Sequence, residues 1–211
     1  MPHAVWLAIF WLMAALPLTA RTITLTVENC DRVAAISGAA PRYGWVGSKG
    51  DNSFFDTNQL NLSTYEAVLL CFRLEAIPKD QRVVRAELVI PVANVHNQKG
   101  GLYVWKLLVP WGVGASYRDR QARPERVAWN LGGARGPGSD RAREPSVVLR
   151  LTSETGEISL NVTADVDLWH SGSLANYGWI LCGEVPGEAV RVPNPQWSPR
   201  SWKLRITYEK S

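Results

Sequence analysis

Residues 161–181 read NVTADVDLWHSGSLANYGWIL and combine a strand end, a short helix, a tight turn and a second strand. Val162, Val166 and Trp169 are spaced by four and then three residues, so they share one side of a helix. This pattern is typical of a unit that closes the open end of an all-β domain. It does not have the character of a reaction centre.

The two ends of this helix carry signals of their own. Thr163 is placed to act as the N-cap, with a hydroxyl that satisfies the first free amides. Asp165 and Asp167 suit the positive N-terminal end of a helix, and Gly172 can end the turn with a positive φ. We therefore expect one short capping helix near residues 163–170.

Strand signals dominate the rest of the chain. Short runs rich in β-branched and aromatic residues are bounded by Gly, Pro, Asn or Ser, and no window of a dozen residues has a helical period. These runs are residues 22–27, 67–74, 83–92, 102–109, 146–151, 157–162, 178–182 and 202–208. Many short strands without intervening helices predict an all-β domain, a sandwich or a barrel, with Greek-key or jelly-roll connections.

The first 20 residues have the pattern of a secretory signal peptide. Residues 4–15 form an apolar run, Pro17 interrupts it, and Ala20 supplies a small residue before Arg21. The alternative is an uncleaved anchor, although the run is short for a membrane span. We expect residues 21–211 to form a single domain that is secreted, periplasmic or at the cell surface, without membrane insertion.

The chain has three cysteines, Cys30, Cys71 and Cys182. An odd number does not make a disulfide framework, although one disulfide and one free thiol remain open. Cys71 and Cys182 lie in apolar strand-like runs, where a buried cysteine acts as a small hydrophobic residue. No two cysteines have the close spacing of a zinc site.

Two long irregular stretches, residues 43–64 and 110–145, interrupt the strand pattern, and loops of this length often carry function. The second contains seven arginines between Arg118 and Arg143, a cluster that favours an anionic partner. A solvated loop rich in arginine is the alternative. Nucleic acid is not expected, because the formal net charge is only +4 and no recognition motif is present.

Five segments form an ordered set along the chain. They are AVLLCFRL at 67–74 with the following Ile77-Pro78, VRAELVI at 84–90, Trp111 with AWN at 128–130, the opening segment with its Asn176-Tyr177-Gly178, and LRITY at 204–208. In this order they resemble the DNRLRE domains, also grouped as carbohydrate-binding module family 96. The resemblance implies a single-domain antiparallel β-sandwich of jelly-roll type, secretion, and attachment to polysaccharide, with acidic glycans such as alginate as the precedent.

Tryptophan is the first residue type to consider for a carbohydrate site, because indole faces stack on the C–H faces of sugar rings. Those expected to contact a ligand lie in loop sequence near Gly or Pro, and they are Trp45, Trp111 and Trp197. Those in strand or cap patterns are expected in the core, and they are Trp105, Trp129, Trp169 and Trp202.

The arginine cluster supplies candidates for an acidic ligand. Arg118, Arg120, Arg123 and Arg126 can offer forked donors to uronate carboxylates or sulfates. Tyr117 stands directly before them in the sequence. If the partner is an acidic polysaccharide, we expect it to bind here.

An oxygen-rich run offers candidates for a structural calcium ion. Asp51, Asn52, Asp56 and Asn58 could assemble oxygen ligands, which Ca²⁺ prefers. Their spacing does not match an EF-hand loop, and turn formation by Asp and Asn explains the run equally well. We expect no other cofactor.

An enzyme would need acid and base groups in a recognisable arrangement. Only His96 and His170 follow the signal sequence, and the chain has neither a Gly-x-Ser-x-Gly elbow nor an HExxH motif. His170 and Ser171 fall in the cap turn, where both are ordinary surface residues. We therefore expect no enzyme activity.

The leading hypothesis is a secreted, non-catalytic carbohydrate-binding module that attaches to an acidic polysaccharide. A structural or adhesive cell-surface domain that binds another protein of the cell envelope is the alternative from a different class. A jelly-roll polysaccharide lyase is the third hypothesis.

Overall fold

The computed structural model describes residues 20–39, 58–95, 100–151 and 156–210. Within these ranges the chain is mostly antiparallel β-structure with one α-helix, which confirms the predicted fold class. The predicted signal peptide lies outside them apart from Ala20. No helix in these ranges has the length and apolar content needed to cross a bilayer.

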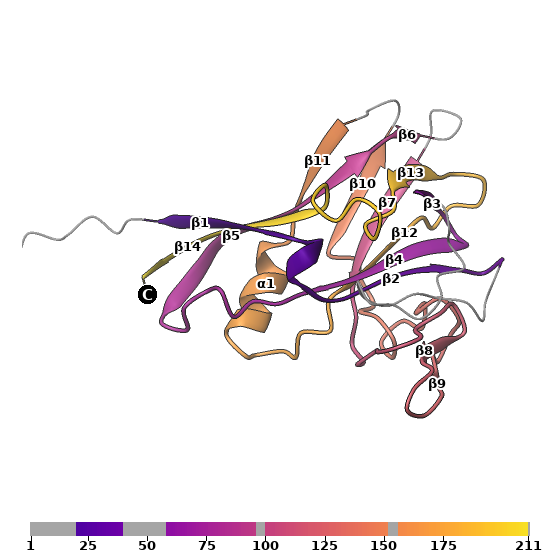
Figure 1. Cartoon of the computed structure of the whole chain (residues 1–211), viewed down its shortest axis with the longest axis horizontal. Helices are drawn as coiled ribbons and strands as arrows, with labels where there is room; N and C mark the ends of the chain where they lie inside the picture. Colours follow the sequence, from indigo (N-terminus) through magenta and orange to yellow (C-terminus); the bar gives the residue numbers. More distant parts are fainter. Residues whose placement is uncertain (1–19, 40–57, 96–99, 152–155, 211) are drawn as a thin grey trace, which may run out of the picture.

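The first sheet has four antiparallel strands in the order β1-β14-β5-β11 (Figure 1). In its centre Leu204 of β14 lies opposite Leu88 of β5, and Ile206 lies opposite Ala86. All four side chains are fully buried, so this pairing gives the sheet one continuous apolar face. The strand bounds are Arg21–Thr26 for β1, Lys203–Lys210 for β14, Gln81–Val92 for β5 and Gly156–Asn161 for β11.

The second sheet has five antiparallel strands in the order β10-β7-β12-β4-β2. Its central strand β12 has four residues, WILC, and all four are buried. A strand buried on both faces reads as a continuous apolar run without alternation. The strand bounds are Val147–Leu151 for β10, Gly100–Lys106 for β7, Trp179–Cys182 for β12, Glu66–Phe72 for β4 and Cys30–Ser37 for β2.

Eight of these strands have the connectivity of a jelly roll. When β1, β4, β5, β7, β10, β11, β12 and β14 are counted from 1 to 8, the first sheet has the order 1-8-3-6 and the second 5-4-7-2. This order makes two interlocked Greek keys, as the family resemblance implied. β2 is an additional strand at the edge of the second sheet.

Shorter elements extend the sandwich. β3 (Gln59–Leu62), β13 (Val190–Pro193) and β6 (Asn94–Val95) form a separate three-stranded sheet, and β6 follows β5 almost directly in the chain. A 3-10 turn, η1 (Val27–Asn29), joins β1 to β2. In the long connection after β7, β8 (Asp119–Gln121) pairs with β9 (Val127–Ala128).

The sequence did not predict β2, β3 or β13. In β2 the central residues Ala34, Ala35 and Ile36 have no exposed surface, although the strand lies at a sheet edge. Because both faces of β2 are covered, its sequence lacks the polar and apolar alternation by which a half-buried strand is recognised. In β3 and β13 the runs are only four residues long and give a weak signal for that reason.

Two separate hydrophobic cores hold the layers together. The core between the two sheets includes Trp169, Trp179 and Trp202. The second core lies on the outer face of the second sheet and includes Trp105, Trp111 and Trp129. The predicted burial of Trp105, Trp129, Trp169 and Trp202 is therefore confirmed.

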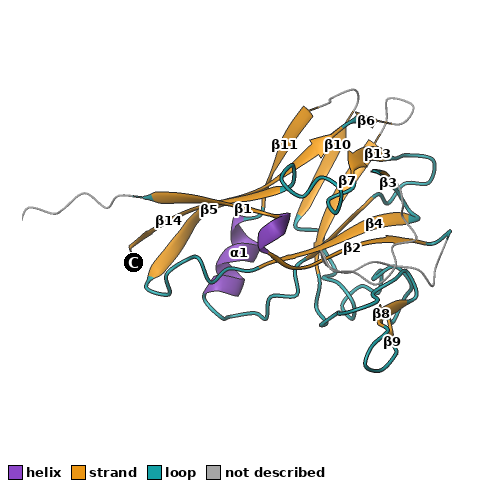
Figure 2. Ribbon diagram, viewed as in Figure 1, coloured by secondary structure: helices purple, strands orange, loops and turns teal. Residues whose placement is uncertain are grey.

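The predicted capping helix is α1 (Thr163–His170), which packs against β5 and appears in purple in Figure 2. Val162 and Val166 are buried and Trp169 is 7% exposed, as the spacing predicted. The ring of Trp169 lies 4.5 Å from that of Trp179, at a tilt of 58°. Gly172 ends the turn with a φ of +74°, which was also predicted.

The prediction that Thr163 is the N-cap was wrong by one residue, because Val162 holds that position. Thr163 instead accepts a hydrogen bond on Oγ1 from the backbone N–H of Ala86 at 2.9 Å. The Oδ1 atom of Asn161 accepts from the Thr163 backbone N–H at 3.0 Å and from its hydroxyl at 2.7 Å. The start of the helix is thus tied to β5 and closed by the last residue of β11.

All three cysteines are free thiols. Cys71 and Cys182 are buried, as predicted. Cys30 packs on the core between the sheets, whereas Cys71 belongs to the core outside the second sheet. Since their side chains point to opposite faces, the two cannot approach to disulfide distance without backbone movement.

Candidate functional site

The connection between β7 and β10, residues 107–146, covers the outer face of the second sheet. Figure 2 shows its loops around β8 and β9, next to β2 and β4. An apolar cluster lies beneath these loops. It contains Trp111 and Trp129 of the connection, Trp105 of β7, and Ile36 and Leu69 of the sheet. The connection therefore forms a third layer, and most of its apolar residues are used for folding.

Trp111 is one of the residues in this layer and is only 1% exposed. Its indole N–H donates to the carbonyl of Tyr177 at 2.8 Å, and the guanidinium of Arg32 lies 5.2 Å from the ring centroid. This burial leaves no face of the indole for a sugar ring, contrary to the prediction. The sequence was misleading here because a buried loop tryptophan and an exposed one have the same Gly and Pro neighbours.

Two arginines of the predicted cluster are structural. The guanidinium of Arg141 lies 3.9 Å from the centroid of the Trp105 ring, and its Nη1 atom lies 2.8 Å from Oε1 of Glu184. Arg135 reaches the same oxygen at 3.1 Å. Burial raises the pKa of Glu184, but the hydrogen bond and charge of Arg141, together with Arg135, outweigh it and hold the pKa below 4.5. These contacts attach the third layer to the end of β12.

Arg118 and Arg126 remain exposed on either side of one carboxylate. Their side chains are 52% and 60% exposed, and their Nε atoms lie 3.8 and 3.5 Å from different oxygens of Asp119. The Asp119 side chain is only 4% exposed, and its Oδ1 atom has no hydrogen-bond partner. The two guanidinium groups are therefore held close together, with one positive charge in excess.

The other predicted arginines lie on the same connection. Arg120 lies in β8 and donates from Nη1 to the carbonyl of Pro110. Arg123 is exposed in the turn between β8 and β9. Arg118, Arg120, Arg123 and Arg126 together form the arginine surface of the β8–β9 hairpin.

Tyr117 is half-buried between glycine backbones. The ring packs so closely on Gly133 and Gly132 that a side chain would not fit there. A Cβ atom on Gly133 would lie 2.7 Å from the Tyr117 ring, and a Cβ atom on Gly132 would lie 3.0 Å from it. On Gly38 a Cβ atom would lie 3.3 Å from both the Tyr117 ring and the ring of Tyr65. Tyr65 is 66% exposed, so it presents an open aromatic face beside Tyr117. Tyr65 was not predicted as a site residue, although its place in a turn before β4 was a usable signal.

Trp197 is 59% exposed, in agreement with its predicted loop position. It lies in the turn between β13 and β14, where its backbone N–H donates to the carbonyl of Asn194 at 3.0 Å. In Figure 1 this turn is separated from β8 and β9. The structure therefore does not bring Trp197 into the arginine surface. The third predicted tryptophan, Trp45, lies outside the described residues.

The predicted calcium ligands fall mostly outside the described part of the chain. Asp51, Asn52 and Asp56 are not described, and Asn58 is an exposed residue before β3 whose carbonyl accepts from the Asn194 backbone N–H at 2.9 Å. Among the described residues no group of three or more His, Cys, Asp and Glu side chains could hold a metal ion. The calcium site stays a prediction.

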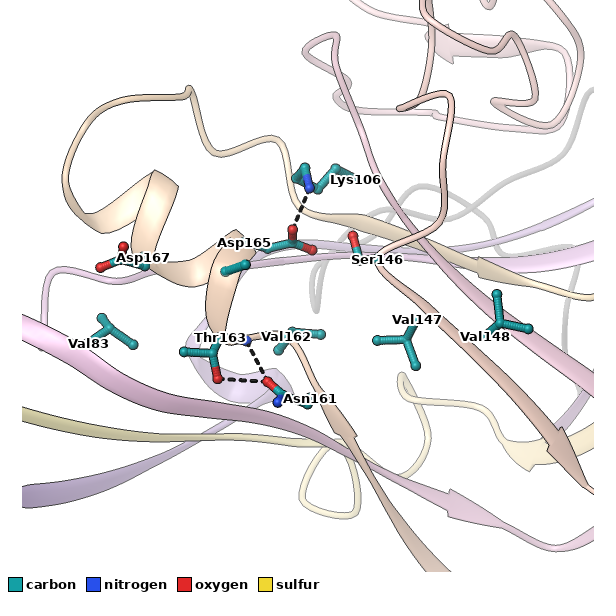
Figure 3. Close-up of a pocket in the computed structure, with 11 residues that line it drawn as sticks. Val83, Lys106, Ser146, Val147, Val148, Asn161, Val162, Thr163, Asp165 and Asp167 are labelled. Atoms are coloured by element: carbon teal, nitrogen blue, oxygen red, sulfur yellow. Dashed lines mark hydrogen bonds and ion pairs between the residues drawn. The ribbon is translucent and has the colours of Figure 1, made fainter.

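The structure also shows a pocket that the sequence did not predict. It lies beside the start of α1 and has a volume of about 790 Å³ (Figure 3). Its polar lining includes Lys106, Ser146, Asn161 and Asp165, which come from three separate segments of the chain. Only the closing of the sandwich end by α1 brings these side chains together.

A smaller pocket of about 440 Å³ lies at the other end of α1. His170 lines it, and the Nε2 atom of His170 lies 3.0 Å from the carbonyl oxygen of Gln81. The hydroxyl of Ser171 is hydrogen-bonded to Leu168 and Ser173. His170 and Ser171 thus have separate partners, although they are neighbours in the sequence.

The chain matches no protein-family model. No curated protein matches it either.

Proposed function

We propose that this chain is a secreted, non-catalytic module that binds an acidic polysaccharide at the arginine surface, beside Tyr65 and Tyr117. The observation that carries the proposal is the pair of exposed guanidinium groups that Asp119 holds together through Nε. In this arrangement the outer Nη atoms of both arginines stay available. Guanidinium forks bind carboxylates and sulfates through two parallel hydrogen bonds.

Tyr65 adds the apolar part of such a site. Tyr65 is two-thirds exposed, and its ring lies across Gly38 from Tyr117. An aromatic face next to cationic donors suits an acidic sugar, because the pyranose ring has C–H faces and a charged substituent. The two features support one ligand class, a polyuronate or a sulfated glycan.

Affinity electrophoresis tests the proposal directly. We expect gels that contain alginate, pectate or a sulfated galactan to retard the protein, and a gel with neutral xylan to retard it less. Added salt should weaken the retardation, because the contacts of exposed charges are screened. Mobility that is unchanged across the whole panel would contradict the proposal.

A double variant locates the site. Arg118→Ala with Arg126→Ala should abolish most of the retardation, and Tyr65→Ala should reduce it. The matched control is Arg21→Ala with Arg200→Ala, which removes the same charge at two exposed positions outside the arginine surface. Equal loss in both double variants would mean that net charge alone causes the retardation.

The lyase hypothesis can be tested on the same samples. A lyase makes unsaturated uronate products that absorb in the ultraviolet. We expect no increase in absorbance when the protein is incubated with alginate or pectate. A steady increase would replace the binding proposal with a catalytic one.

A further inference from the structure

The pocket beside α1 lies where three strand ends meet the helix. Lys106 is the last residue of β7, Ser146 precedes β10, and Asn161 is the last residue of β11. Its volume of about 790 Å³ is within the range of pockets that hold small organic ligands. In Figure 1 α1 and the arginine surface at β8 and β9 occupy separate places.

A partly buried ion pair forms one wall of this pocket. Nζ of Lys106 lies 2.5 Å from Oδ1 of Asp165, and the side chains are 21% and 3% exposed. The indole N–H of Trp179 donates to the other carboxylate oxygen at 2.7 Å. The carboxylate is thus fixed from two sides, while the ammonium keeps two further N–H donors. Figure 3 shows Lys106 and Asp165 facing each other at this wall.

Two more polar groups of the lining have unused hydrogen-bonding capacity. Oγ of Ser146 is buried and has no hydrogen-bond partner among the described residues. Asn161 uses Oδ1 to close the start of α1, which leaves its amide N–H groups as donors. A buried polar atom without a partner costs free energy, and a ligand hydroxyl would remove that cost.

The charges of the lining disfavour an anion. Lys106 is balanced by Asp165, and Asp167 adds an exposed carboxylate that nothing in the lining neutralises. The pocket therefore has one net negative charge, opposite in sign to the arginine surface. A neutral ligand with several hydroxyl groups suits it better than an acidic sugar.

The rest of the lining is aliphatic. Val83 and Val162 are buried, and Val148 is 49% exposed at the rim. Aliphatic walls beside a few fixed polar groups are the usual composition of a small-molecule site. They match the C–H faces of a sugar ring, and the polar wall matches its hydroxyls.

We propose that this pocket binds a neutral sugar residue, whose hydroxyl groups bond to Lys106, Ser146 and Asn161. This site is separate from the arginine surface and does not depend on it. Asp165 holds Lys106 in place, and the polar groups left for a ligand are the remaining N–H donors of Lys106, Oγ of Ser146 and the amide of Asn161.

Ligand-observed NMR on the full-length protein tests the proposal. The probes are glucose, galactose, mannose, xylose and glucuronate at millimolar concentration. We expect saturation transfer to at least one neutral sugar and weaker transfer to glucuronate than to glucose. Absence of transfer to every neutral sugar, or preferred binding of glucuronate, would overturn the proposal.

Two variants separate a ligand site from a structural one. Ser146→Ala should weaken binding about fivefold while leaving the melting temperature the same or higher, because it removes a buried hydroxyl without a partner. Asn161→Asp keeps the oxygen that closes the helix and removes the amide donor, so it should weaken binding at least as much. Ser159→Ala, in the exposed β11 sequence outside the lining, is the matched control.

The outcomes distinguish this site from the arginine surface. The Arg118→Ala and Arg126→Ala double variant should bind the neutral sugar as well as the unchanged protein does. Binding that is lost in that variant but kept in Ser146→Ala and Asn161→Asp would overturn the pocket proposal. Loss in the pocket variants with unchanged retardation in alginate gels would support two independent sites.

Discussion

The guanidinium of Arg141 lies 3.9 Å from the centroid of the Trp105 ring, and this contact joins the third layer to the second sheet. Trp105 belongs to β7, and Arg141 comes from the end of the connection that covers it. The same guanidinium is paired with Glu184 at 2.8 Å. One side chain thus connects the covering loop to β7 and to the segment that directly follows β12.

We expect Arg141→Ala to lower the free energy of unfolding by about 2–4 kcal/mol, because it removes a buried cation–π contact and leaves Glu184 short of a partner. Urea unfolding followed by tryptophan fluorescence measures the change. Arg143→Ala is the matched control in the same loop, since Arg143 is exposed, and it should stay within about 0.5 kcal/mol. Equal effects of the two variants would show that Arg141 does not attach the layer.

Glu184 should make stability depend on pH in the acid range. Its pKa in the folded chain is below the ordinary 4.5, so the unfolded chain takes up the proton first as the pH falls. The stabilisation by the ionised Glu184 is complete above the pKa of this group in the unfolded chain. It disappears as the pH falls through the pKa of Glu184 in the folded chain. We expect Glu184→Gln to cost about 2 kcal/mol at pH 7 and progressively less as the pH falls below 4.5 to pH 3. Urea unfolding at both pH values measures this, and a difference that does not shrink would contradict the assignment.

Gly178 should be far less tolerant of substitution than Gly172. Both have a positive φ, +76° and +74°, which costs an alanine about 1–2 kcal/mol at either site. At Gly178 a Cβ atom would also lie 1.9 Å from the carbonyl oxygen of Leu70, whereas at Gly172 it meets nothing within 4 Å. Thermal unfolding should show a modest loss for Gly172→Ala and severe destabilisation for Gly178→Ala. Equal losses would mean that φ alone sets the cost.

The buried thiols should react slowly in the folded chain. Burial raises the pKa of Cys182 to about 12 and also raises the pKa of Cys71, so little thiolate exists at pH 8. We expect iodoacetamide to modify neither residue under native conditions and both in denaturant, as peptide mass spectrometry would show. Non-reducing digestion should reveal no disulfide between Cys30 and Cys71, and finding one would contradict the opposed directions of their side chains.

The sequence by itself determined the fold class of this protein, because periodicity is a local property. The strand runs, the buried Val162, Val166 and Trp169 and the positive φ of Gly172 all depend on neighbours within a few residues. Local signals failed where burial depends on distant segments. β2 shows no alternation because residues 107–146 cover its second face, and Trp111 is buried by the same layer.

Only the tertiary structure decided which polar residues share a site. It separated the structural Arg135 and Arg141 from the exposed Arg118 and Arg126, a division that composition cannot make. It also brought Lys106 against Asp165, 59 residues later in the chain. Side-chain contacts between remote segments follow from the packing of whole layers, and the residues at either position carry no local sign of their partner.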